Sequence, residues 1–210
     1  MQLSKSTSWG LILGGLFTLF GFIAIGLVLG LLEDDIAPAD ELKAMQDNQL
    51  FVGVMTVLIV GLFTYLAKSL LEVAQAIKVP DGWYVYLRML VIVMLVTLFV
   101  AIAPALIVSE KTTADNFVTL SLMGEAVDAI QIIAGGFVYI ILAVFALKNG
   151  SGNRIFRTLI ALLGLFALLD IVGVIGPTSE ADDFIEFVVW ILWSVCLVGI
   201  GIQGLTTKEV

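Results

Sequence analysis

The stretch WGLILGGLFTLFGFIAIGLVLGLL, residues 9–32, contains no charged side chain. A helix rises about 1.5 Å per residue, so roughly 20 apolar residues cross the hydrocarbon core of a bilayer. The length and composition of residues 9–32 therefore predict a membrane-spanning helix. The apolar core of a secretory signal is shorter, about 7–15 residues, so we expect this stretch to be retained as a span.

Five further stretches of the same kind follow the first one. Hydrophobic residues make up 60% of the chain and charged residues only 13%, whereas a soluble domain carries about a quarter charged residues. The apolar runs are continuous rather than alternating, which favours helices over barrel strands. The sequence predicts an all-α membrane bundle, a single domain over residues 1–210. Its six transmembrane helices are expected at about 9–32, 50–78, 84–108, 117–147, 155–176 and 184–206.

Charge in the loops predicts the orientation of the spans. The segments after the first, third and fifth spans are rich in carboxylates and contain only Lys43 and Lys111 as bases. Lysine and arginine mark the cytoplasmic side of a membrane protein. We therefore expect cytoplasmic termini, an acidic external face, and a multi-pass location in the plasma or inner membrane. The basic side carries Lys5, Lys78, Arg88, Lys148, Arg154, Arg157 and Lys208.

Each external segment leads into the next span with a similar motif, an acid or amide followed by an aromatic. The motif occurs at 47–51, 114–117 and 181–184. This recurrence is consistent with three successive helical hairpins. It is also what three separate helix starts at a membrane surface require, because each needs a polar cap and an aromatic anchor.

Glycines on the first span are spaced for close helix packing. At 100° per residue they fall on two roughly opposite faces, and small residues let helix backbones approach each other in lipid. We expect this helix to lie between two neighbours, in the same subunit or in another. One face holds Gly10, Gly14 and Gly21, the other holds Gly15, Gly26 and Gly30, and Gly135 adds a small residue to the fourth span.

The fourth span contains acids that are costly in hydrocarbon. Asp128 is expected roughly 16 Å below the external helix start, near the bilayer middle. It shares one helix face with Ser121, Gly124, Gln131 and Gly135, and Glu125 borders that face. A carboxylate at the bilayer centre costs about 2.5–3.5 kcal/mol even on the lenient insertion scale, so this stripe must face other helices or water.

Two more acids are candidates for the same site. Asp170 on the fifth span is expected at a depth close to that of Glu125, and Glu186 lies near the external start of the sixth span. Together with Glu125, Asp128 and Gln131 they predict an ion pathway or binding site. Oxygen ligands suit a proton or a hard monovalent or divalent cation. The other interpretation is that Asp128, Gln131 and Asp170 join helices through hydrogen bonds.

The sequence lacks most residues used in catalysis and cofactor binding. There is no histidine, and the single cysteine, Cys196, lies inside the last span. No phosphate-binding glycine loop and no Ser/His/Asp set are present. We expect a protein that is not an enzyme, carries no cofactor and binds no nucleic acid.

Two functional hypotheses follow from these features. The first is a cation or proton channel or transporter that uses the intramembrane acids. The alternative is a non-catalytic structural or accessory subunit of a larger membrane complex. In either case we expect the lipid bilayer and further membrane subunits as partners. These subunits would be copies of this chain or other polypeptides, because a helix with glycines on two faces can pack against either kind of partner.

Overall fold

The computed structural model describes residues 3–30, 36–103, 105, 108–109, 111–175 and 180–206, and only the backbone of 180–186. The regular secondary structure in these ranges is helical, and six helices are long and apolar enough to cross a membrane. The prediction of an all-α, multi-pass membrane bundle is confirmed at this level. The elements are α1 (Lys5–Leu29), α2 (Pro38–Asp47), α3 (Gln49–Ala76), α4 (Asp81–Ala101), α6 (Ala114–Lys148), α7 (Arg154–Ile175) and α8 (Glu180–Thr206).

Polar residues fix where several helices begin. The Ser4 side chain accepts a hydrogen bond from the Thr7 amide at 3.0 Å, and the Asn153 side chain accepts one from the Phe156 amide at 2.8 Å. Such caps satisfy amides that the first helical turn leaves unpaired. At its other end α1 stops at Gly30, whose φ of 69° is left-handed and suits glycine.

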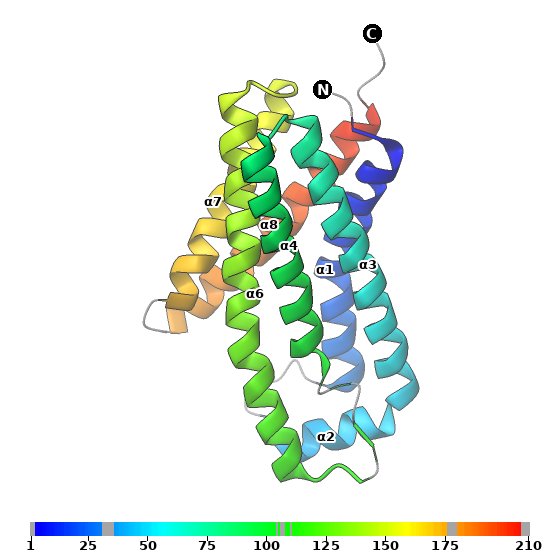
Figure 1. Cartoon of the computed structure of the whole chain (residues 1–210). Helices are drawn as coiled ribbons and strands as arrows, with labels where there is room; N and C mark the ends of the chain where they lie inside the picture. Colours follow the sequence, from blue (N-terminus) through cyan, green and yellow to red (C-terminus); the bar gives the residue numbers. More distant parts are fainter. Residues whose placement is uncertain are drawn as a thin grey trace.

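The six long helices form a closed bundle (Figure 1). Helix α1 packs between α3 and α8, α6 packs between α4 and α7, and the remaining contacts join α3 to α4 and α7 to α8. The first turn of α1 and the last turn of α8 lie at the same end. We call this the basic end, because Lys5, Lys78, Lys148 and Arg154 lie there. The opposite end, where α2 lies and α6 begins, is the acidic end.

Glycines bring α1 into close contact with both of its neighbours. A Cβ at Gly14 would lie 2.9 Å from the Leu66 Cβ of α3, and one at Gly15 would lie 2.9 Å from the Ser194 carbonyl oxygen of α8. Gly10 lies against Ser69 of α3 in the same way, and Gly201 of α8 faces the Ser8 carbonyl. Both neighbours of α1 therefore belong to this chain.

The other singled-out glycines lie in different surroundings. The atoms nearest to a Cβ at Gly21 belong to Phe17 of the same helix, and Gly26 is buried. Gly30 is the cap of α1, with no atom within 4 Å of an added Cβ. A Cβ at Gly135 of α6 would lie 3.2 Å from the Met94 sulfur of α4.

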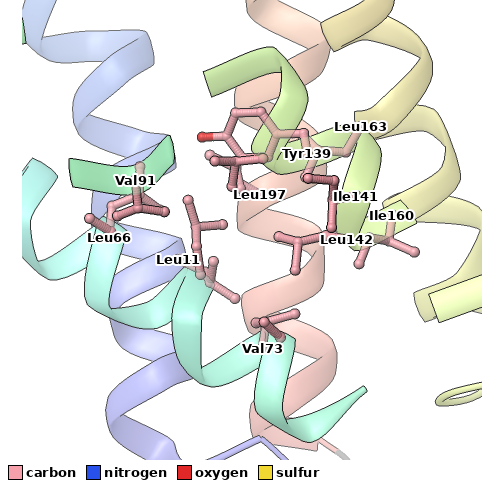
Figure 2. Close-up of a cluster of buried hydrophobic side chains, with 14 of the residues drawn as sticks. Leu11, Leu66, Val73, Val91, Tyr139, Ile141, Leu142, Ile160, Leu163 and Leu197 are labelled. Carbon is pink, nitrogen blue, oxygen red and sulfur yellow. The ribbon is translucent and has the colours of Figure 1, made fainter. Parts of the chain in front are cut away.

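The apolar core fills the half of the bundle near the basic end. Leu11, Leu66, Val91, Leu142 and Leu197 converge there from five helices (Figure 2). Their side chains are at most 2% exposed. Toward the acidic end, Phe22, Ile25 and Leu29 of α1 line a cavity.

Polar side chains close the basic end between α1 and α3. The Thr7 hydroxyl donates to Glu72 Oε2 at 2.6 Å, and Lys68 Nζ lies 2.7 Å from Glu72 Oε1. The Tyr65 hydroxyl donates to the Ser6 carbonyl at 2.6 Å. This partly exposed network supplements the glycine contacts one turn further in, although an exposed ion pair alone stabilises by only about 0–1 kcal/mol.

Helix α2 was not among the predicted elements. The acidic segment between the first two spans was expected to be a loop, but ten of its residues form a helix across the acidic end (Figure 1). Pro38 lies in the first turn of the helix, where a backbone N–H has no helical acceptor, so the missing N–H of proline costs no hydrogen bond. Asp40 and Glu41 lie where the helix dipole favours negative charge. Its Leu42 is buried, and Gln46 Nε2 donates to the Ser109 carbonyl at 2.7 Å.

The glycine contacts of α1 can be tested by a matched pair of substitutions. Gly15→Ala places a methyl group against the Ser194 backbone, so we expect a loss of about 1–3 kcal/mol and a lower melting temperature. Gly61→Ala on α3 meets no atom within 4 Å, so its higher helix propensity, worth roughly 1 kcal/mol, should leave stability equal or higher. Thermal unfolding of the detergent-solubilised protein measures both. Equal melting temperatures for the two variants would contradict close α1–α8 packing.

Candidate functional site: a carboxylate-lined cavity at the acidic end

A cavity of about 390 Å³ lies at the acidic end of the bundle. Helix α2 borders it, and the walls come from the end of α1, the start of α3, the end of α4 and the first half of α6. The volume is within the range of small-molecule sites, about 300–1,000 Å³. The lining residues are Phe22, Ile25, Leu29, Glu41, Met45, Phe51, Val52, Met55, Thr56, Ile59, Ala101, Ile102, Ala105, Phe117, Ser121, Gly124, Glu125 and Asp128.

Carboxylates from two helices line this cavity. Glu125 and Asp128 come from α6, and Glu41 comes from α2. Glu125 is exposed, whereas Asp128 and Glu41 are half-buried. Burial raises the pKa of Glu41, and the negative charge of Glu125 raises it further. Two of the predicted site residues, Glu125 and Asp128, therefore line one cavity, and the structure adds Glu41 as a third acid.

The level of Asp128 in the bundle differs from the expected one. Gly124 lies against the Ala101 carbonyl at the end of α4, and the Phe145 ring lies 5.8 Å from Trp83 at its start. The part of α6 that pairs with α4 is thus centred near Gly135, and Ala114–Met123 extend beyond the end of α4. Asp128 is about 10 Å from that centre and Glu125 about 15 Å, close to the edge of the hydrocarbon.

Asp170 lies deeper than predicted and outside the cavity lining. A Cβ at Gly136 would lie 3.2 Å from the Ala167 carbonyl and close to Ile171, so Asp170 is level with the middle of α6. It lies within electrostatic reach of Tyr139, whose ring is 5.2 Å from that of Trp193. The expected common depth with Glu125 is wrong, because α6 begins well beyond the level at which the neighbouring helices end.

The two remaining predicted residues are also separate from the cavity lining. Gln131 is half-buried on α6, and its buried Oε1 has no hydrogen-bond partner in the structure. Glu186 belongs to α8, but its side chain is outside the described part of the chain. Within the described ranges, no group of three or more Asp, Glu or Cys residues is placed to hold a metal ion.

Glu41 was missed because its segment was taken as a solvent-exposed loop. The local sequence does contain the signals of a helix: Pro38 at the start, acids in the first turn, and apolar Leu42 and Met45 three residues apart. What the sequence does not provide is the direction of the helix axis. Only the packing of α2 across the bundle turns Glu41 toward Glu125.

Comparison with known protein families, with curated proteins and with solved structures finds no match for this chain. The class is set by the fold, which is that of a multi-pass membrane protein. Its function must be inferred from the cavity and its charges.

The raised pKa of Glu41 predicts a pH-dependent stability. Glu41 binds its proton more tightly in the folded state than in the unfolded state, so protonation stabilises the fold. This stabilisation is complete below about pH 4.5, the ordinary pKa, and is lost as the pH rises through the raised pKa. Glu41→Gln mimics the protonated form. Its melting temperature should exceed that of the wild type at neutral pH, and the difference should vanish below pH 4.5.

The exposed neighbour Asp40 supplies the control for this measurement. Asp40→Asn removes a carboxylate from the same helix turn without changing the cavity lining, so it should not stabilise the protein at neutral pH. A wild type and a Glu41→Gln variant that melt alike across the whole pH range would show that Glu41 is solvated rather than buried.

Proposed function

We propose that this chain is a membrane transport protein, a channel or carrier, that moves a cation or a proton. The observation that supports the proposal is the cavity lined by Glu41, Glu125 and Asp128 at the acidic end. An ionised carboxylate below the membrane surface is expensive, and such residues in membrane proteins commonly line the paths of ions and protons. A positive charge bound in the cavity would offset part of that cost.

The charge distribution supports an orientation for this transporter. Lysines and arginines gather at the basic end, and the positive-inside rule places that end in the cytoplasm. Both termini would then be cytoplasmic, the three-hairpin arrangement would follow, and the cavity would face outward in a plasma or inner membrane. Acids at the outer rim, among them Asp40 and Asp47, would raise the local cation concentration.

A path from the cavity toward the cytoplasm would pass along α6. The basic half is closed by the apolar core around Leu66 and Leu142, so transport requires a rearrangement of the helices there. Gln131 and Asp170 lie nearer the bilayer middle than Asp128 and would be the next polar groups for an ion or proton to meet. Glu186 is retained from the sequence as a candidate for the mouth of the path.

The accessory-subunit hypothesis has less support. A glycine-faced first helix would suit contact with a partner subunit, but the closest of these glycine contacts are made to α3 and α8 of the same chain. The cavity is likewise enclosed by helices of a single chain, so a pore around a symmetry axis is not needed to form it. Association with further copies or other subunits stays a prediction.

Ion flux into proteoliposomes tests the proposal. We expect cation or proton uptake by the wild type, and roughly tenfold slower uptake by Asp128→Asn and by Glu125→Gln, because each loses a charge that attracts the ion. Asp115→Asn removes an exposed carboxylate at the start of α6, outside the cavity lining, and should transport normally. Wild-type liposomes no more permeable than empty ones to protons, sodium, potassium and organic ammonium ions would refute the proposal.

A further inference from the structure

We infer that the cavity at the acidic end binds a small organic cation, an amine with an aromatic or branched apolar body. This inference rests on the proposed function and narrows its substrate class. The chemistry of the cavity walls carries it: charge on one side, aromatic and thioether side chains on the others, and a volume suited to a molecule rather than to a bare ion.

The size of the cavity argues against a bare ion as its occupant. Water takes up about 30 Å³ per molecule in the liquid, so a dehydrated ion would leave most of the 390 Å³ empty or filled with water. Lining such a space with Ile25, Leu29 and Ile59 is unfavourable for water, which needs polar partners to be held. An apolar body fills this volume and buries those side chains.

The carboxylates that line the cavity also argue against a bare metal ion as its occupant. Calcium takes six to eight oxygen ligands, and magnesium needs nearly ideal octahedral geometry. Within the described residues no three acidic side chains are grouped closely enough to hold a metal ion. The carboxylates Glu41, Glu125 and Asp128 line one cavity without forming a coordination shell. Charge complementarity with one or two ammonium groups does not require such a shell.

Aromatic and thioether side chains complete the complementarity. Phe22, Phe51 and Phe117 reach the cavity from α1, α3 and α6. An ammonium group over an aromatic face is attracted by the negative face of the ring, most strongly when both are desolvated. Met45 and Met55 are flexible, polarisable side chains that adapt to irregular apolar shapes. These contacts favour a cation with an apolar body over a hydrated inorganic ion.

The test measures binding of benzyltrimethylammonium to the purified full-length protein in detergent, by equilibrium dialysis. Neopentylbenzene is its neutral isostere, with a carbon in place of the nitrogen. We expect saturable binding of the cation, much weaker binding of the isostere, and little competition from excess sodium. Glu125→Gln, which alters an already exposed side chain, should weaken binding roughly tenfold, as loss of one charge interaction does. Asp115→Asn should bind like the wild type.

The outcomes separate this inference from the transport proposal. Saturable, charge-dependent binding supports the inference even if no flux is found, in which case transport alone fails. Sodium or proton flux that benzyltrimethylammonium neither inhibits nor accompanies, with no saturable binding, overturns the inference and leaves transport standing. Equal affinity for the cation and its isostere, or for wild type and Glu125→Gln, also overturns it, because the carboxylates would then play no part.

Discussion

The close approach of α1 to its two neighbours is the contact on which the rest of the bundle depends. Lipid tails are as apolar as leucine, so membrane helices associate through packing rather than through exclusion of water. Gly10 and Gly14 allow that packing toward α3, and Gly15 allows it toward α8. Further along α1, Phe22, Ile25 and Leu29 line the cavity instead. The bundle is therefore tight near the basic end and open near the acidic end.

The position of the cavity follows from this gradient in packing, and the position of the acids follows from the cavity. Glu125 and Asp128 lie on α6 where its partner α4 is ending, so they have space and are near the membrane surface. Their electrostatic cost is smaller there than at the bilayer centre, because charges near an interface can reach water. Helix α2 then partly covers the same space and adds Glu41, and this enclosure raises the pKa of the Glu41 carboxyl.

The spans were predictable because twenty apolar residues have few alternatives in a chain of this composition. The predicted range 50–78 agrees closely with the observed Gln49–Ala76, whereas the predicted 84–108 compares with Asp81–Ala101 and the predicted 9–32 with Lys5–Leu29. Two features of the structure could not be predicted from the sequence. The relative heights of helices depend on packing, so counting residues from each predicted helix start placed Asp170 level with Glu125, although α6 extends beyond α4 by several turns. The role of Glu41 depends on which side of α2 meets the bundle, and charge counting cannot distinguish a lining acid from a loop acid.

The contact between α1 and α8 also determines the order in which the bundle can assemble. Ser8 meets Gly201 and Gly204, so residues almost two hundred positions apart must come together before α1 has both neighbours. Contacts this distant in sequence form slowly and late, after local pairs such as α6 with α7. During synthesis the Gly15 side of α1 would face lipid until the last span is inserted. A nascent chain lacking α8 is thus a partly assembled bundle with one uncovered small-residue face, the kind of intermediate that chaperones and membrane proteases recognise.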